Sequence, residues 1–298
     1  MDDALKLTIN LEEYLFIKDY KDNREYRQSL NRLAKKVYGF DFEEWYQQGY
    51  WSDKYRPYSL VHNGEVVANV SVNTIDFLIE GELHHTVQIG TVMTEEAYRN
   101  RGLSKELMNL IVNEYEDTCE LMYLYANDSV LEFYPKFDFV QAEEFVYTRQ
   151  FTQRANKLTC RKINMKKAED KAMITRLISS TLPVSKISMI GNPGLDMFYL
   201  TAFLSEDIYY IEELDLAAVV DFNEDNMFLM ELFCEKEFDM EEVINSLTNK
   251  PDMKVTLGFT PLIDTDFTCE LLKEEGTTYF VRGENITGRG KFPILSHA

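Results

Sequence analysis

The turn Arg99–Ser104 constrains the fold of this chain more than any other stretch of it. An apolar run at residues 87–93 precedes the turn, and apolar residues at helical spacing follow it over residues 105–116. The N-terminus of a helix presents backbone N–H groups that have no intrahelical partner, and the helix dipole adds positive potential there. Gly102 lets the backbone approach a ligand closely, and the two arginines of the turn suit phosphate oxygens. Strand, glycine turn and helix therefore predict a phosphate-binding loop.

This turn resembles the acyl-CoA pyrophosphate loop of the GCN5-related N-acetyltransferases (the GNAT family), whose pattern is Gln/Arg-x-x-Gly-x-Gly/Ala. Here the pattern is Arg99-x-x-Gly102-x-Ser104, with a small serine in the last position. Such a short match is weak by itself. The following stretch is also similar, because a strand-like run at 121–126 leads to Asn127 and then to residues 130–139, which end Phe-Tyr-x-x-x-Asp-Phe where the family has Phe-Tyr-x-x-x-Gly-Phe. Several matches in the same order make the resemblance specific.

The resemblance implies an α/β fold of the α+β type, in which helices flank a mixed, mostly antiparallel twisted sheet: the acyl-CoA N-acyltransferase fold. We expect it in residues 1–151, with the acyl-CoA site. Residues 152–298 are expected to form a second α/β domain, and the order of their predicted elements echoes the first. Residues 233–239 stand where the phosphate loop of a second copy would be, yet they contain no glycine and three carboxylates. A degenerate second copy without a cofactor site is therefore a hypothesis.

Hydrophobic periodicity predicts the individual elements. Apolar and aromatic residues at steps of three and four indicate a helix over 24–38 and a shorter one over 41–50. Asn63-Gly64 between two alternating runs indicates a hairpin, and residues 144–150 are predicted to be the last strand of the first domain. In the second half we expect helices at 168–179, around 195–204 and at 240–247 after Asp239 as N-cap, and strands at 208–212, 216–222, 227–234, 254–260 and 277–282.

The resemblance also implies roles for single residues. Residues 90–93 would splay from the strand at 121–126 and expose backbone groups to the pantetheine arm, and the N–H of Val92 would polarise the thioester carbonyl. Tyr134 would protonate the leaving thiolate, although it could instead be a core tyrosine in an aromatic cluster. Asn127 would bind the pantetheine arm or only end its strand as a turn residue. The predicted catalytic residues are Tyr134 and Val92, and the predicted acetyl-CoA contacts are Thr91, Val92, Met93, Arg99, Asn100, Arg101, Gly102, Leu103, Ser104, Asn127 and Tyr134.

The general base is not readable from the sequence. His84, His85, Asp76, Glu80 and a chain of waters are all candidates, but for the two histidines a solvated strand end is the favoured interpretation. Aromatic residues crowd the stretch 45–58, where the family shapes its acceptor pocket, but packing in the core explains each of them equally well.

The composition of the chain limits the kinds of binding partner that we expect. The 31 basic and 51 acidic residues give a formal charge of −20, which opposes binding to nucleic acid or to an anionic membrane and weakly favours a cationic acceptor. The four cysteines lie far apart, so neither a zinc site nor a disulfide framework is expected, and no metal is predicted. Met1-Asp2-Asp3 opens without the features of a leader peptide and no run is long enough to span a bilayer, so we expect a cytoplasmic protein.

The leading hypothesis is an N-acetyltransferase that moves an acetyl or other acyl group from acetyl-CoA to a primary amine by direct attack. The acceptor, a small molecule or a protein amine, is not readable, and neither is the oligomeric state. The alternative is a non-catalytic or regulatory CoA-binding protein whose second domain recognises a partner. A dinucleotide-binding oxidoreductase is disfavoured, because the chain has no Gly-x-Gly-x-x-Gly run.

Overall fold

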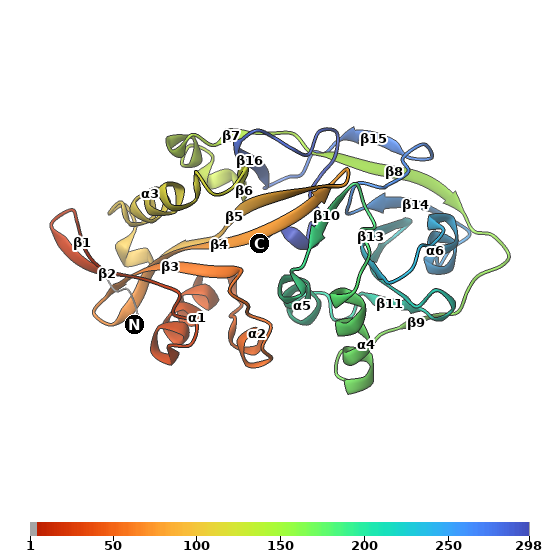
Figure 1. Cartoon of the computed structure of the whole chain (residues 1–298), viewed down its shortest axis with the longest axis horizontal. Coiled ribbons are helices and arrows are strands. Elements are labelled where there is room, and N and C mark those ends of the chain that lie inside the picture. Colours follow the sequence, from red (N-terminus) through yellow and green to blue (C-terminus); the bar gives the residue numbers. More distant parts are fainter. Residues whose placement is uncertain (1–4, 298) are drawn as a thin grey trace.

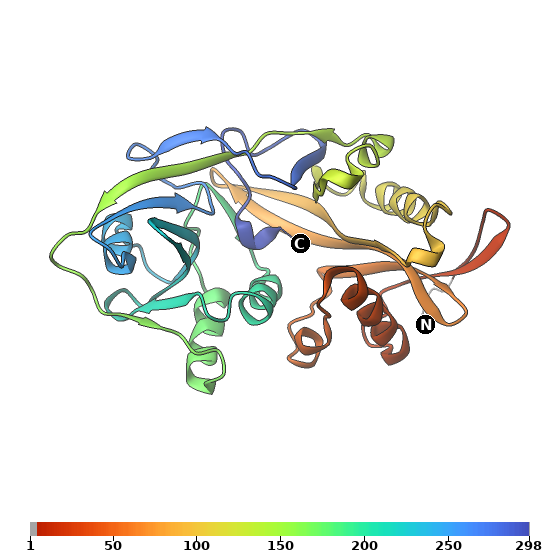
Figure 2. The ribbon, with the colours of Figure 1, turned by 180° about the vertical axis from the view of Figure 1, so that it is seen from behind.

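The structure is a computed structural model that describes residues 5–297, so Met1–Asp3, considered above for a leader, lie outside the described residues. The chain forms two sheets that lie side by side (Figures 1 and 2). Along the first sheet the strands follow the order β1 (Leu5–Ile9), β2 (Glu12–Lys18), β3 (Tyr55–His62), β4 (Glu65–Ile79), β5 (Glu82–Thr94), β6 (Leu121–Ala126), β16 (Thr278–Gly283) and β7 (Val140–Gln141), with β10 (Ile187–Ile190) beside β4.

The second sheet has the order β15 (Thr268–Leu271), β8 (Phe145–Thr152), β14 (Asp252–Leu257), β13 (Asn226–Cys234), β12 (Leu216–Asn223), β11 (Ile208–Ile211) and β9 (Cys160–Lys162). Neighbouring strands are antiparallel in both sheets except for two parallel pairs, β5 with β6 and β13 with β14. The helices that flank the sheets are α1 (Arg24–Tyr38), α2 (Glu43–Gln47), α3 (Leu103–Tyr115), α4 (Ala168–Ser179), α5 (Pro193–Ala202) and α6 (Met240–Leu247). The predicted mixed, mostly antiparallel α/β class is confirmed.

The two sheets exchange strands. We predicted residues 144–150 as the strand that closes the first sheet, and this is wrong: β8 pairs with β14 and β15 in the second sheet. The place beside β6 is taken by β16, from the far end of the chain. In Figures 1 and 2, β8 runs away from β7 into the second sheet while β16 lies beside β6. Division of the chain into domains at residue 151 stays a prediction, but the first sheet takes β10 and β16 from beyond that point, and the second sheet takes β8 from before it.

The two halves repeat one order of elements. In each half a helix links two parallel strands, α3 between β5 and β6, and α6 between β13 and β14. Strand β5 carries a bulge opposite Asn69–Ser71, and β13 carries one opposite Val219–Val220. The hypothesis of a second, degenerate copy is consistent with this order.

Helix α1 forms where the sequence predicted it, and its ends show why. The side chain of Asn23 accepts hydrogen bonds from the N–H groups of Glu25 and Tyr26, and Gly39 ends the helix in the left-handed conformation. Asp239 caps α6 in the predicted way. Five short strands, however, were not predicted: β1, β7, β9, β10 and β15. They have two to five residues each, too few for a clear alternation of apolar and polar side chains.

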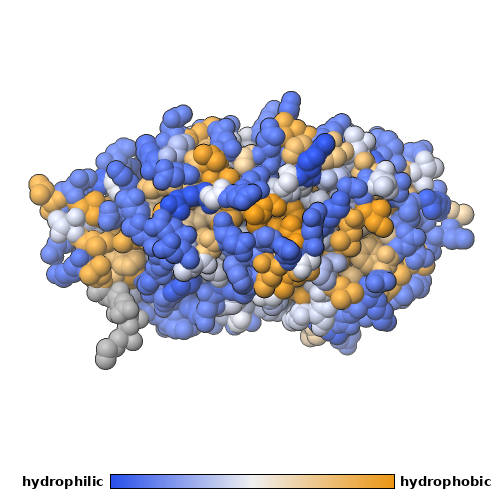
Figure 3. Space-filling model, turned by 45° about the horizontal axis from the view of Figure 1, so that its top comes forward, coloured by the Kyte–Doolittle hydropathy of each residue, from blue (hydrophilic) through white to orange (hydrophobic). Residues whose placement is uncertain are grey.

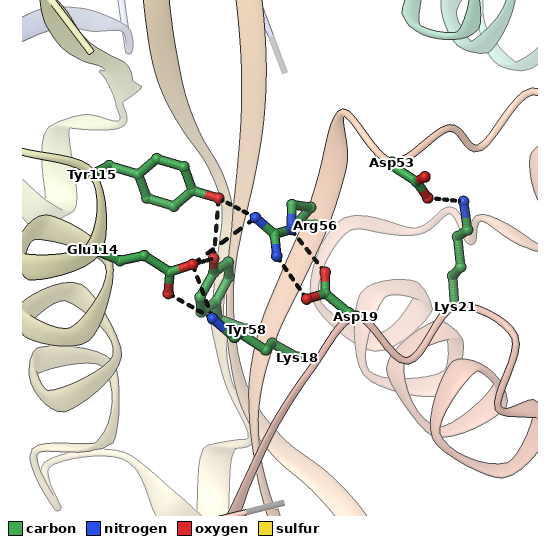
Figure 4. A network of polar contacts seen from close by, with 8 residues as sticks. All are labelled: Lys18, Asp19, Lys21, Asp53, Arg56, Tyr58, Glu114 and Tyr115. Carbon is green, nitrogen blue, oxygen red and sulfur yellow. Dashed lines mark hydrogen bonds and ion pairs between the residues drawn. The ribbon is translucent and has the colours of Figure 1, made fainter. Parts of the chain in front are cut away.

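Helices cover both faces of the first sheet. Helix α3 packs its Leu107, Met108 and Ile111 on one face, and α1, α2 and the second-half helix α5 pack on the other. A polar network holds the C-terminal end of α3 against β2 and β3 (Figure 4). Its centre is Arg56, which binds Asp19 through two hydrogen bonds of 2.7 and 2.6 Å and donates to the Tyr115 hydroxyl at 2.9 Å.

The outer surface in Figure 3 is rich in polar residues. The face in Figure 3 is largely hydrophilic, with apolar residues gathered near its centre. No helix within residues 5–297 is both long enough and apolar enough to cross a membrane.

Candidate functional site

The bulge in β5 is the most unusual backbone feature of the first sheet. Asn69 pairs with Met93 and Ser71 pairs with Gly90, so the stretch Gly90–Met93 has one residue more than its partner strand. Thr91 takes a φ of +43°, which is unfavourable for a β-branched residue. Such a conformation persists only where the surroundings enforce it, and it occurs preferentially at functional sites.

A buried network of side chains enforces the bulge. The Tyr55 hydroxyl lies 2.8 Å from the Thr91 hydroxyl, and Asn69 donates to the Thr91 carbonyl at 3.0 Å. Ser71 joins the two supports, since it donates to Tyr55 at 2.8 Å and accepts from Asn69 at 2.9 Å. Behind them, Ser59 donates to Asn69 at 2.8 Å. Hydrogen bonds therefore fix both the side-chain hydroxyl and the main-chain carbonyl of Thr91 in the bulge.

After Gln88, just before the bulge, β5 and β6 stop pairing, which agrees with the divergence that the resemblance implied. The two strands pair at only three positions, from Thr86 with Leu121 to Gln88 with Tyr123. A cavity of about 540 Å³ opens at the diverging ends. It is lined by Tyr38, Phe40, Ile89, Gly90, Thr91, Val92, Thr94, Arg99, Ser104, Tyr125, Ala126, Asn127, Val130, Phe133, Tyr134, Gly276 and Thr277. We call this cavity the β5/β6 cleft.

The predicted phosphate loop stands at one end of the β5/β6 cleft. Gly102 precedes α3 with a φ of +81°, and α3 has no side-chain cap within the described part of the chain. The N–H of Glu106 donates to the Gly102 carbonyl at 3.1 Å. Asn10 donates to the Arg101 carbonyl at 2.7 Å, and the hydroxyls of Ser104 and Thr94 lie 2.7 Å apart. The helix N-terminus is thus fixed and offers uncapped N–H groups to an anion.

The two arginines of the loop differ in orientation. Arg99 lines the cleft and donates from Nε to the Thr94 carbonyl at 3.3 Å. Arg101 instead pairs with Glu12 at 2.8 Å and lies over the Tyr98 ring at 4.7 Å. Only Arg99 therefore presents its cation to the cleft in this structure.

Tyr134 begins the short 3-10 helix Tyr134–Phe137 and lines the cleft, although only 5% of it is exposed. Its ring packs against Phe133, Phe139 and Phe280, which agrees with the alternative that Tyr134 is a core tyrosine in an aromatic cluster. Its hydroxyl has no hydrogen-bond partner among residues 5–297. Burial, with the nearby Tyr38 phenol, raises the pKa of Tyr134. The two interpretations are therefore compatible: the ring is core and the hydroxyl is free beside the cleft.

The remaining predicted residues differ in which of their atoms could reach a ligand in the cleft. Asn127 lines the cleft, but its side chain also accepts from the Ser129 N–H at 3.2 Å, which is the turn role left open by the sequence. The side chains of Met93 and Leu103 lie in the two cores, each 1% exposed, so only their main chains could contact a ligand. Asn100 is exposed and adopts a φ of +62° next to the loop glycine.

Sequence reasoning missed an aromatic wall at the other end of the cleft. The Tyr38 hydroxyl donates to the Val92 carbonyl at 3.0 Å, and Phe40 follows it at the end of α1. Phe198 of the second-half helix α5 packs edge-on against Phe40. The aromatic spacing of residues 38, 40 and 42 was a usable signal, whereas the contribution of α5 depends on long-range packing.

The candidate bases proposed from the sequence lie elsewhere. His85 is hydrogen-bonded to Asp76 and His84 to Glu120, each at 2.7 Å. His85 precedes Val92 by seven residues on β5, about 23 Å at the usual rise of a strand. Glu80 lines a different cavity, between the two sheets. Among residues 5–297 no group of three or more His, Cys, Asp or Glu side chains could hold a metal ion.

A bulged strand that diverges from a parallel neighbour, beside a glycine turn and an uncapped helix, defines the acyl-CoA N-acyltransferase fold. Residues 20–142 match the sequence model of the acetyltransferase (GNAT) domain. Over this stretch, which is less than half of the chain, the sequence is therefore similar to the GNAT family. A search among curated proteins finds no match to this sequence.

Solved structures agree in fold over both halves. The chain is similar to a probable N-acyltransferase from Enterococcus faecalis, with a TM-score of 0.58 and 12% identity over 95% of this chain and 72% of that chain. A GCN5-related N-acetyltransferase from Kribbella flavida gives 0.53 and 16%, over 94% and 71%. One from Anabaena variabilis gives 0.52 and 12%, over 91% and 74%. At these identities the likeness establishes the fold.

Proposed function

We propose that this protein transfers an acetyl group from acetyl-CoA to a primary amine by direct attack of the amine on the thioester. The observation that carries the proposal is the β5/β6 cleft, which joins a bulged strand, an uncapped helix N-terminus and a free tyrosine hydroxyl. Much of the rate can come from holding the two substrates in line.

The cofactor would lie along the cleft. The loop Arg99–Ser104 would bind the pyrophosphate through its N–H groups, with Arg99 as the cation. The pantetheine arm would pair with the exposed edges of β5 and β6, beyond their last shared pair. The N–H of Val92 would then stabilise the oxyanion, because the Thr91 bulge fixes the backbone there.

Tyr134 would protonate the thiolate that leaves. A phenol carries its proton at neutral pH, and burial raises the pKa of Tyr134 further, so the hydroxyl is protonated when the thiolate leaves. The absence of a partner for its hydroxyl within residues 5–297 leaves the proton free for the sulfur.

The second half would not bind a second cofactor. In its loop, residues 235–239 carry three carboxylates, and Asp239 already caps α6. The place between β13 and β14 that corresponds to the cleft is filled by the chain itself: Gly258 donates to Leu229 at 2.7 Å and accepts from Ile294 at 3.0 Å. We therefore propose one acyl-CoA site per chain and a degenerate second copy of the fold. From composition alone we also propose a cytoplasmic protein that binds neither nucleic acid nor membrane.

Two measurements test the function. Calorimetry with acetyl-CoA should show one site per chain. A thiol-release assay with a panel of aryl, alkyl, polyamine and amino-sugar acceptors should identify amines that release CoA above the background of hydrolysis. Binding without release from any amine would favour a non-catalytic CoA-binding protein, and the absence of binding would defeat the site.

A further inference from the structure

The buried carboxylate of Glu144 is hydrogen-bonded to Tyr125, a residue that lines the β5/β6 cleft. Tyr125 of β6 lines the cleft, and its hydroxyl donates to Oε1 of Glu144 at 3.0 Å. Glu144 lies just before β8, where the chain leaves the first sheet, and is 5% exposed. No other described carboxylate is hydrogen-bonded to a side chain that lines the cleft.

The position of this pair is fixed from several sides. Oε1 of Glu144 also accepts from the N–H of Phe292 at 3.2 Å, and its carbonyl accepts from Leu272 at 2.8 Å. The Tyr125 ring stacks with His297, at 3.8 Å between ring centroids, and with Tyr279 at 5.4 Å. A side chain held in this way can act at a defined distance from a bound substrate.

The electrostatic surroundings suit a base that works near neutral pH. Burial raises the pKa of Glu144 to about 7, while the charge of Lys291 and the Tyr125 hydrogen bond act in the opposite direction. Glu274 raises this pKa further, and Tyr123 and Tyr279 are the other titratable groups that face the carboxylate. Lys291 is itself 3% exposed, and burial lowers its pKa. A base whose pKa is close to the working pH is deprotonated in a large fraction of the molecules and is still basic enough to drive the proton transfer.

We infer that Tyr125 takes a proton from the attacking amine while it passes its own hydroxyl proton to Glu144. This inference rests on the proposed acetyl transfer. The amine nitrogen forms the new C–N bond, the C–S bond breaks, and the thiolate takes the proton of Tyr134. The proton lost by the amine replaces the one that Tyr125 gives to the Glu144 carboxylate. Tyr125 is thus the group at the substrate, and Glu144 acts through it.

The decisive variant is Glu144→Gln, because the amide oxygen can still accept from Tyr125 but cannot take up a proton. We expect kcat to fall about 100-fold and the decline of kcat below pH 7 to disappear. The affinity for acetyl-CoA, measured by calorimetry, should not change. Tyr125→Phe should lower kcat similarly, and Glu144→Asp, which keeps the carboxylate, should recover part of the rate and the acidic limb.

The matched control is Glu143→Gln, the exposed neighbouring glutamate, which should behave as the wild type. Thermal melting of each variant checks that it is folded. A Glu144→Gln protein with wild-type kcat and an unchanged acidic limb would overturn the relay while leaving acetyl transfer in place. If the wild-type protein binds no acetyl-CoA, or acetylates no amine, the proposed function fails and the relay fails with it.

Discussion

The two bulged strands, β5 and β13, show how one topology can serve two purposes. In β5 the bulge is held by the neutral network of Tyr55, Asn69 and Ser71 and faces an open cleft. In β13 the extra residue is Met230, the buried carboxylate of Glu231 lies next to it, and the backbone of Gly258 is hydrogen-bonded to Leu229 and Ile294. The halves share the order of three strands, a helix and a strand, so we expect a few side chains and one loop to decide which half accepts a ligand.

The largest effect should come from the loop that distinguishes the halves. We expect Gly102→Glu to abolish binding of acetyl-CoA in calorimetry, because it places bulk and negative charge where the pyrophosphate would lie. Gly64→Glu is the matched control, since Gly64 has a similar φ of +79° in a distant hairpin turn. If the two variants bind acetyl-CoA equally well, the loop is not the anion site.

The second effect concerns the tyrosine at the cleft. Tyr134→Phe should lower kcat about 100-fold or more while the affinity for acetyl-CoA stays nearly constant. Tyr210→Phe, which removes a hydroxyl bound to Asp215 in the second half, should leave turnover unchanged. Steady-state kinetics on both proteins would refute the acid role if the two have the same kcat.

The network behind β5 gives a third test. Tyr55→Phe removes the hydroxyl that joins Ser71 to Thr91, and we expect a loss of about 1–3 kcal/mol in the free energy of unfolding. It should also lower kcat, because the bulge that fixes the Val92 N–H would relax. Tyr58→Phe, in the network of Figure 4, removes another buried hydroxyl and should reduce stability in urea denaturation without changing kcat. Equal losses of activity in both would show that the Tyr55 effect is not local.

The smallest effect should appear at the second bulge. Burial raises the pKa of Glu231 to about 7, and burial together with the charge of Glu231 raises the pKa of Asp196 on α5. The folded protein therefore holds a proton that the unfolded chain releases at lower pH, so stability falls as pH rises from about 4.5 to about 7. We expect Glu231→Gln to add about 1–3 kcal/mol to the free energy of unfolding at pH 8 and clearly less at pH 5. The exposed Glu237→Gln should add nothing, and a gain that does not depend on pH would contradict the interpretation.

The sequence predicted local structure better than long-range pairing. Helices α1, α4 and α6 appear with the predicted bounds, because periodicity and caps are encoded within a few residues. The strand that pairs with β8 was not predictable, because the alternation of apolar and polar residues indicates a strand but not the strand beside it.

The site shows the same limit. The loop and the divergence of β5 from β6 were readable as an ordered motif. The turn of Arg101 toward Glu12, the aromatic wall that α5 supports, and the contact between Tyr125 and Glu144 all depend on segments far apart in the sequence.

The exchange of β8 and β16 also sets the order in which the molecule can be built. During synthesis, β6 emerges well before its neighbour β16, because residues 127–277 separate the two strands. The β5/β6 cleft, which Gly276 and Thr277 help to line, can therefore be completed only when β16 has been made. Pairings between such distant segments carry a large loop-closure cost, so we expect folding to be slow and the nascent first sheet to need protection along its open β6 edge.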